Sequence, residues 1–355
     1  MTARTDALIM FFDFLPALFT TFVCALIAVK ATQPLAQEIG LIDKPCNRKN
    51  HSGNIPLVGG ISIFLAVLVA SSLWLPDTLE LRMYLISSSM LVFIGILDDK
   101  YDLSVRVRLV GQTIIASLMM FGVSTYISNF GNLLGFGIVD IGVFGFLFTY
   151  FAILVMINAF NMIDGMDGLL GSQALNTLIS IAFLFYLHGN VTDLNYPLII
   201  VFAILPYLAF NMGFFKKYTS KVYMGDAGSM FIGLSVIWLL AKGTQGADAS
   251  FKPVTALWIT AIPLMDMLAI VIRRVRNGRL PFKADRDHIH HICIKAGLSA
   301  NKTLSLITTA SVIMSSIGIL GHIYSVPDVI MLVTFLCVFF VYSWALRKVS
   351  KNQKD

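Results

Sequence analysis

Four short motifs rich in Asp, Asn, Gly and His interrupt an otherwise apolar chain, each at the end of a hydrophobic segment. In the first motif, Asp98 and Asp99 directly follow such a segment and Asp102 lies one helical turn further on. Carboxylates at this spacing can share hard divalent cations. The alternative is a solvated loop in which Arg106 and Arg108 pair with the aspartates. Two aspartates set directly against an apolar segment favour metal or phosphate chemistry.

The second motif places Asn161 just before a turn that holds Asp164 and Asp167, each followed by a glycine. Glycines let the backbone approach a ligand closely, and the N-terminus of the next helix presents free N–H groups suited to phosphate. Asn and Asp also cap helices at tight turns without any further role. The concentration of such residues in an apolar stretch favours a functional site over capping alone.

The third motif, Met224-Gly225-Asp226-Ala227-Gly228-Ser229, sets one carboxylate between glycines at the predicted start of a helix. An N-cap role would account for Asp226 by itself. Its expected position on the same side of the membrane as the first two motifs makes it a candidate metal ligand.

The fourth motif contains His288, His290 and His291, preceded directly by Arg286. Three histidines could bind zinc, but no Cys or Glu stands at the spacing of a metalloprotease. Phosphate recognition agrees better with the neighbouring arginines, because the guanidinium group binds phosphate in a bidentate manner. We therefore expect this motif to contact phosphate.

Two further positions are candidates for a role in the site. Asp266 lies within a predicted span, where an acid is a functional candidate by default, and a structural pair with a neighbouring helix is an equally good interpretation. The first inner loop carries Asp43 and Lys49, which we expect to contact the substrate.

The composition excludes a soluble globular protein, because 57% of the 355 residues are hydrophobic, 13% are charged and the mean hydropathy is +0.80. We predict an all-α polytopic membrane protein with about 11 transmembrane helices. Their apolar runs lie at about 14–31, 57–75, 83–97, 109–127, 142–163, 169–187, 194–213, 228–241, 253–272, 304–321 and 326–346.

The distribution of basic residues predicts the orientation, because cytoplasmic loops carry an excess of Lys and Arg. The predicted outer segments hold only Arg4, Arg82, Lys242 and Lys252 of the chain's 26 Lys and Arg. The N-terminus is therefore expected to be periplasmic and the C-terminus cytoplasmic. Residues 1–355 form a single integral membrane domain with inner loops at about 32–56, 98–108, 164–168, 214–227 and 273–303. The net charge of +6 reflects this topology and not a nucleic-acid partner.

Two predicted spans are short, from Arg82 to Asp98 and from Asp226 to Lys242. Each apolar stretch covers roughly 22 Å, against a hydrocarbon core of about 30 Å. We therefore expect Asp98, Asp99 and Asp226 to lie slightly below the membrane surface, in a pocket walled by other helices, since charge facing lipid is costly at that depth.

Taken in order, these motifs resemble the polyprenyl-phosphate N-acetylhexosamine-1-phosphate transferase family, from residues 40–45 and 56–60 to residues 285–291. Residues 262–267 and the form of the histidine motif are similar to the bacterial branch that uses UDP-N-acetylglucosamine in O-antigen or enterobacterial common antigen synthesis. The branch that makes the first peptidoglycan lipid usually has three consecutive histidines. Ile289 interrupts them here, which disfavours the peptidoglycan precursor as substrate.

The resemblance implies transfer of N-acetylglucosamine 1-phosphate from UDP-N-acetylglucosamine to undecaprenyl phosphate, with release of UMP, at the cytoplasmic face of the bacterial inner membrane. It implies Mg²⁺ (or Mn²⁺) on Asp226 with Asp99 and Asp98, and a homodimer is a further expectation. Asp98 is expected to keep the lipid phosphate deprotonated. The implied catalytic residues are Asp98, Asp99, Asp164, Asp167 and Asp226, and the implied substrate contacts are Asp43, Lys49, Asn161, Arg286, His288, His290 and His291.

Two alternatives remain open. The first is the same transfer with another UDP-N-acetylhexosamine, including the peptidoglycan precursor. The second is a secondary transporter that uses Asp266 as an ion site, which predicts inverted repeats and broken helices near the midplane of the membrane. The sequence shows no internal repeat.

Overall fold

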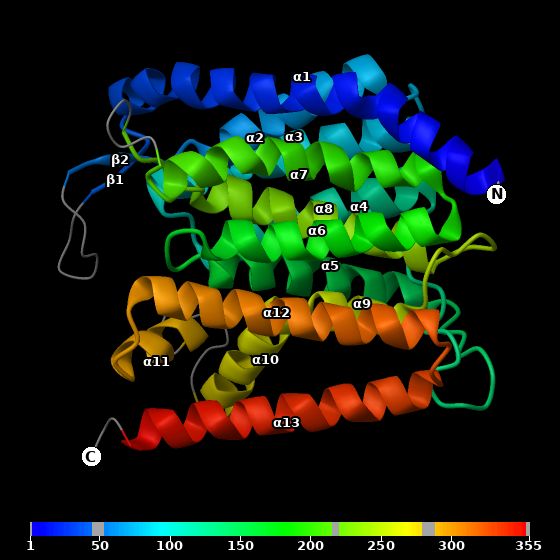
Figure 1. Ribbon diagram of the computed structural model, residues 1–355. Coiled ribbons are helices and arrows are strands. Elements are labelled where there is room, and N and C mark those ends of the chain that lie inside the picture. The colour runs from blue at the N-terminus through cyan, green and yellow to red at the C-terminus, as the bar shows by residue number, and fades with distance from the viewer. Residues whose placement is uncertain (1, 45–52, 215–219, 279–287, 353–355) are drawn as a thin grey trace.

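The computed structural model describes residues 2–44, 53–214, 220–278 and 288–352, and this part of the chain is nearly all helical (Figure 1). The helices are α1 (Thr2–Ile39), α2 (Gly59–Trp74), α3 (Leu79–Tyr101), α4 (Val105–Val123), α5 (Phe144–Ile163), α6 (Leu169–His188), α7 (Val191–Asn211), α8 (Gly225–Thr244), α9 (Pro253–Ile259), α10 (Ala261–Arg276), α11 (Ile289–Lys295), α12 (Ala300–Ile323) and α13 (Asp328–Asn352). Strands β1 (Ile42–Asp43) and β2 (Ile55–Pro56) form a short antiparallel pair.

Among the described residues, 9 helices are long and apolar enough to cross a membrane, or 10 if the bent pair of α9 and α10 counts as one span. The apolar helix α2 is shorter, at 16 residues. The predicted multi-pass helical membrane protein is therefore confirmed. The N-terminus and the C-terminus lie at opposite ends of the helical bundle (Figure 1).

The prediction of two short helices is wrong. Helix α3 has 23 residues and α8 has 20, so they extend over about 34 Å and 30 Å. Both helices continue through the charged residues that were expected to end them. Lys242 lies in the last turn of α8, where its Nζ atom is 2.6 Å from Glu80 and 3.2 Å from Asp193. Pairing of this kind lets the helix keep a charged residue at its end.

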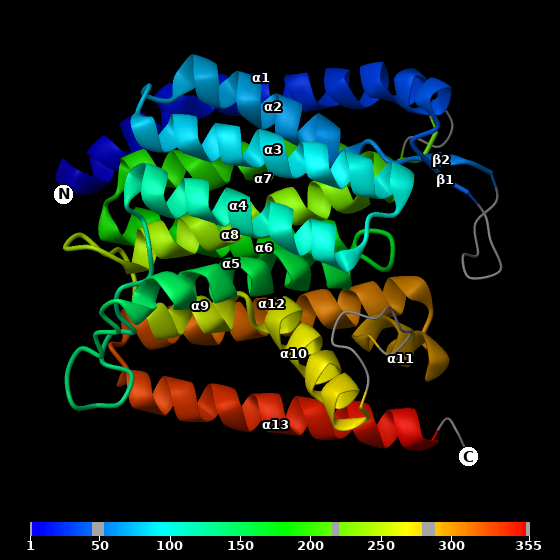
Figure 2. The ribbon, with the colours of Figure 1, turned by 180° about the vertical axis from the view of Figure 1, so that it is seen from behind.

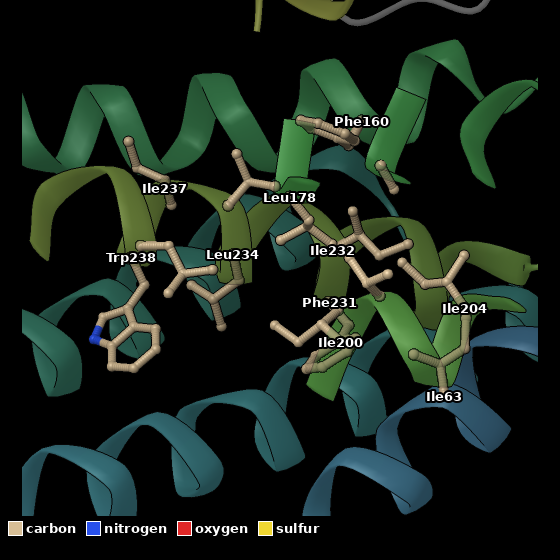
Figure 3. Packing of buried hydrophobic residues seen from close by; sticks show 14 of the residues in the cluster. Ile63, Phe160, Leu178, Ile200, Ile204, Phe231, Ile232, Leu234, Ile237 and Trp238 are labelled. Carbon is tan, nitrogen blue, oxygen red and sulfur yellow. The ribbon is translucent and has the colours of Figure 1, made fainter. Parts of the chain in front are cut away.

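The helical bundle is built around α8. In the most apolar stretch of this helix, 94% of the residues are buried. Small residues allow this dense packing, because a β-carbon on Gly60 of α2 would lie only 2.1 Å from the Gly228 backbone, and one on Gly233 would lie 2.6 Å from Ile157 of α5. Figure 3 shows the large apolar side chains that fill the remaining space around this helix: Ile63, Phe160, Leu178, Ile200, Ile204, Phe231, Ile232, Leu234, Ile237 and Trp238.

The predicted span 253–272 is not one straight helix, because it bends by 81° between α9 and α10. Pro263 has no N–H group, so it cannot bond to the Ile259 carbonyl four residues earlier. The Thr177 hydroxyl of α6 donates to this carbonyl instead, at 3.1 Å. Figure 2 shows α10 leaving α9 at a steep angle and approaching α13.

Candidate active site

Asp99 links α3 to the start of α8. Its two carboxylate oxygens accept hydrogen bonds from the backbone N–H groups of Asp226, at 2.8 Å, and Ala227, at 3.3 Å. The N-terminus of a helix has unsatisfied N–H groups and a partial positive charge, so a carboxylate is stable there. The close approach also requires glycine at position 225, since a β-carbon on Gly225 would lie 2.5 Å from Asp99 Oδ2.

Asp98 is held by groups from the following turn and helix. Its side chain is 2% exposed, its Oδ2 atom is 2.9 Å from the Arg108 guanidinium, and its Oδ1 atom accepts from the Leu103 N–H group. Arg108 is also 3.9 Å from Asp226 Oδ2. An ion pair between the aspartates and Arg108 is therefore present, and Arg108 belongs to the site although the sequence analysis did not place it there.

Asp226 and Asn161 meet across α8 and α5. The Asn161 amide donates to Asp226 Oδ1 at 2.7 Å and to the Ser229 hydroxyl at 2.9 Å. Asn161 therefore fixes the orientation of the Asp226 carboxylate and leaves its Oδ2 atom on the side of Arg108.

The turn between α5 and α6 brings Asp164 near the same carboxylates. Desolvation by the surrounding chain, followed by the charges of Asp226 and Asp167, raises the pKa of Asp164 to about 7, although its side chain is accessible to solvent. Asp167 forms an exposed ion pair with Lys221. A group with a perturbed pKa among other carboxylates is typical of a functional site.

Asn211 supports this turn, and the sequence analysis missed it. Its side-chain oxygen accepts from the Gly168 N–H group at 2.7 Å, and its amide donates to the Val222 carbonyl at 2.9 Å. Asn211 is buried, and Gly168 adopts a φ of +75° that favours glycine. The side chain therefore ties the turn to the segment that leads into α8.

The histidine motif packs directly on the same turn. His290 is 1% exposed, and a β-carbon on Gly165 would lie 2.1 Å from its ring. The His290 ring is 4.1 Å from the ring of His291 and 5.8 Å from that of His288, measured between centroids. Desolvation, followed by the proximity of His291 and His288, lowers the pKa of His290 to about 3. The expected inner loop is here partly helical, since His290 and His291 lie on α11.

His288 is anchored to Asp266 of α10. Its Nδ1 atom is 2.9 Å from Asp266 Oδ2, while Asp266 Oδ1 accepts from the Ile289 N–H group and from the Tyr342 hydroxyl, each at 3.0 Å. The expected pair of Asp266 with a neighbouring element is therefore present.

Asp43 lies in β1, beside the site. The first loop is attached to the site through β2 and the start of α2, because the Tyr223 N–H group donates to the Pro56 carbonyl at 3.0 Å and the Gly60 N–H group donates to the Met224 carbonyl at 2.9 Å. Burial, followed by the charges of Asp167, Asp43 and Asp164, raises the pKa of Tyr223 to about 12. Lys49 and Arg286 lie outside the described residues.

The structure thus brings Asp98, Asp99, Asn161, Asp164 and Asp226 into one cluster, which we call the acidic cluster. His290 borders it through Gly165, with the rings of His288 and His291 beside His290, and Asp167 and Asp43 lie at its edge. In the described ranges, no three His, Cys, Asp or Glu side chains are arranged to hold a metal ion. The donors nevertheless suit a hard cation, because carboxylate oxygens are the ligands that such cations prefer.

Comparison with known proteins agrees with this arrangement. A family model described as glycosyl transferase family 4 matches residues 81–244, which include all five members of the acidic cluster. An undecaprenyl-phosphate alpha-N-acetylglucosaminyl 1-phosphate transferase from Escherichia coli is 40% identical over 99% of this chain and 93% of that protein. The protein of the same name from Haemophilus influenzae is 44% identical over 93% of each chain. The chain therefore belongs to glycosyl transferase family 4, and the resemblance to the polyprenyl-phosphate N-acetylhexosamine-1-phosphate transferases is confirmed.

Proposed function

We propose that this protein transfers N-acetylglucosamine 1-phosphate from UDP-N-acetylglucosamine to undecaprenyl phosphate, forming undecaprenyl-diphosphate N-acetylglucosamine and UMP. The observation that carries the proposal is the position of Asp226 among Asp98, Asp99 and Asp164, beside a turn that contacts His290. The names and the coverage of the relatives support the identity of the substrates.

In this reaction an oxygen of the lipid phosphate attacks the sugar-bearing phosphorus, and the bond to the phosphate of UMP breaks. A phosphate monoester has a second pKa of about 6, so the nucleophile is already mostly dianionic at neutral pH. Asp98 therefore does not need to remove a proton. Its pair with Arg108 instead places a guanidinium group where a phosphate can approach, because guanidinium groups bind phosphate oxygens well.

We propose that Asp226, with Asp98 and Asp99, would hold Mg²⁺ (or Mn²⁺). The ion would supply positive charge that screens the diphosphate and stabilises the departing UMP. The acidic cluster fits such an ion because the carboxylates of Asp98, Asp99 and Asp226 gather around Arg108 and the N-terminus of α8, and hard oxygen donors are the ligands these cations prefer. Asn161 and Asp164 would orient the carboxylates and the nucleotide, while the histidines contact the sugar diphosphate.

The lipid acceptor requires an apolar path beside the site. A cavity of about 410 Å³ lies between α5, α8, α9 and α10, and its lining is almost entirely apolar, with Phe151, Leu257 and Leu264 among its residues. We propose that part of the prenyl chain occupies this cavity. The cavity lies toward the C-terminal end of α8, where Ile237 and Leu240 line it, so it would hold a distal part of the prenyl chain while the phosphate reaches the acidic cluster at the start of α8.

We further propose about 11 spans, with α2 and the bent pair each crossing once, a periplasmic N-terminus and an active site that faces the cytoplasm of a bacterial inner membrane. The excess of Lys and Arg at the end of the bundle that carries the acidic cluster supports this orientation. A homodimer is also part of the proposal, and the mass of the protein in detergent would test it.

The transporter alternative predicts a broken helix, and the bend between α9 and α10 is such a feature. However, the carboxylate of Asp266 is engaged by His288, Ile289 and Tyr342 and is linked to the transferase motifs. We therefore favour the enzyme.

The decisive experiment measures UMP release by purified protein in detergent, with undecaprenyl phosphate and UDP-N-acetylglucosamine, with and without Mg²⁺. We expect release that requires both the lipid and the metal and that falls by at least about 1,000-fold in Asp226→Asn. Asp140→Asn is the matched control, because Asp140 is an exposed aspartate in the hairpin between α4 and α5 whose Oδ1 atom accepts from the Gly142 N–H group of the same hairpin. Lack of release by folded protein would contradict the proposal, and release with UDP-N-acetylgalactosamine alone would revise the sugar.

A further inference from the structure

Asp266 connects three separate elements at one carboxylate. It lies on α10, is 1% exposed, and receives hydrogen bonds from His288 before α11, from the first backbone N–H group of α11, and from Tyr342 on α13. A buried carboxylate with good acceptor geometry to three donors fixes all three groups. The position of the histidine motif therefore depends on residues far from the acidic cluster.

The contact with Asp266 also selects the tautomer of His288. An ionised carboxylate can only accept hydrogen bonds, so the Nδ1 atom of His288, at 2.9 Å, must carry the hydrogen. The Nε2 atom is then the ring nitrogen that can accept a hydrogen bond in the neutral ring. A carboxylate that orients an imidazole in this way is a recurring arrangement around functional histidines.

Tyr342 brings the last helix into the same arrangement. Its hydroxyl donates to the oxygen of Asp266 that also accepts from the Ile289 N–H group. The interaction joins α13 to the start of α11, and α13 and α11 also contact each other directly. From there His290 reaches Gly165 of the turn that contains Asp164.

We propose that Asp266 and Tyr342 are positioning residues for the transferase reaction, holding His288 with Nδ1 protonated and Nε2 available to a hydrogen-bond donor of the sugar nucleotide. The inference rests on the proposed function. It extends the functional site to α10 and α13, outside the segment 81–244 that the family model covers. A hydroxyl or the acetamido N–H group of the hexosamine is the chemistry that such an acceptor would recognise.

The first test measures the tautomer without activity. Protein labelled with ¹⁵N in histidine is studied by NMR in detergent, and His288→Gln identifies the His288 signals. At a pH high enough for the ring to be neutral, we expect the hydrogen of His288 on Nδ1. In Asp266→Asn the side-chain amide can donate to Nδ1, so the hydrogen should move to Nε2. A His288 ring with its hydrogen on Nε2 in the unaltered protein would overturn the proposal.

The second test is kinetic. Asp266→Asn should lower kcat/KM for UDP-N-acetylglucosamine by about 100-fold and Tyr342→Phe by about tenfold, while the KM for undecaprenyl phosphate stays unchanged. Asp266→Glu should restore part of the loss. If Asp266 acts through His288, adding Asp266→Asn to His288→Ala should lower the rate no further, whereas a general structural defect would add to it.

Two controls separate positioning from damage to the fold. Tyr150→Phe removes a tyrosine hydroxyl that bonds to Ser117 at 2.7 Å, and Asp328→Asn removes a buried carboxylate of α13 that pairs with Lys252 at 2.8 Å. Both should leave the kinetics unchanged. Additive losses in the double variant would refute the inference about Asp266, whereas an inactive unaltered protein with the expected His288 tautomer would refute only the proposed function.

Discussion

Gly165 and His290 lie in direct contact, with no room for a side chain between the turn and the imidazole ring. A β-carbon on Gly165 would lie 2.1 Å from His290 Cε1 and 2.2 Å from Nε2. The two residues are far apart in the sequence, and their contact joins the acidic cluster to the histidine motif. The requirement for glycine here is therefore steric, because the neighbouring ring occupies the space of a side chain.

Substitution of Gly165 by Ala should separate the two motifs. The added methyl group must displace the His290 ring, and overpacking of this kind typically destabilises a protein by about 1–3 kcal/mol. We expect UMP release to fall by about 100-fold, because the two motifs no longer lie in register. The protein should remain folded, with only a modest drop in its melting temperature. Gly111→Ala is the matched control, since its new methyl group would meet only the flexible end of Ile94. Normal turnover in Gly165→Ala would show that the contact is not needed.

The buried position of His290 predicts a specific dependence of stability on pH. Its pKa is lowered to about 3, so between the ordinary value of 6.5 and pH 3 the unfolded chain binds a proton that the folded chain does not. His290 therefore makes folding less favourable as the pH falls below about 6.5. When the pH is lowered from 7.5 to 5, the melting temperature should drop less in His290→Gln than in the unaltered protein. Equal drops would mean that His290 is protonated in the folded state.

The residue types at the site could be predicted from the sequence because each motif is local. Asp98 and Asp99, Asp164 and Asp226 all stand at the ends of apolar segments, and this pattern is sufficient to predict that they face one side of the membrane. The apolar runs likewise predicted the helical class, since a helix that crosses a membrane leaves a long continuous signal.

The distant partners of these residues could not be predicted, because they depend on tertiary contacts. Tyr342 reaches Asp266 from a helix 76 residues further on. Arg108, which is close in sequence, was named as a partner of the aspartates, but only as the alternative to a functional site. The bend between α9 and α10 had a local signal in Pro263, which the apolar pattern obscured. Helix ends near Arg82 and Lys242 were misplaced because ion pairs allow charged residues to continue a helix.

Arg108 should compete with the proposed metal ion for the acidic cluster. Its guanidinium is 2.9 Å from Asp98 and 3.9 Å from Asp226, so its removal makes the local potential more negative. Arg108→Gln should lower the Mg²⁺ concentration for half-maximal activity by about tenfold while it also lowers kcat. Arg106→Gln, which alters an exposed arginine two positions away, is the control. An unchanged Mg²⁺ requirement in Arg108→Gln would place the metal away from this pair.

Asp164 and Asp167 occupy one turn but should differ sharply in importance. Asp164 lies near Asp226, whose charge contributes to the raised pKa, whereas Asp167 forms an exposed ion pair with Lys221. Exposed ion pairs contribute at most about 1 kcal/mol, so Asp167→Asn should lower UMP release by less than about tenfold. Asp164→Asn removes a carboxylate that, with a pKa of about 7, is partly ionised at neutral pH, and it should lower UMP release by at least about 100-fold. Each substitution replaces a carboxylate by an amide of the same size, so each serves as the control for the other. Equal losses in the two variants would mean that the turn as a whole, and not the Asp164 carboxylate, supports the reaction.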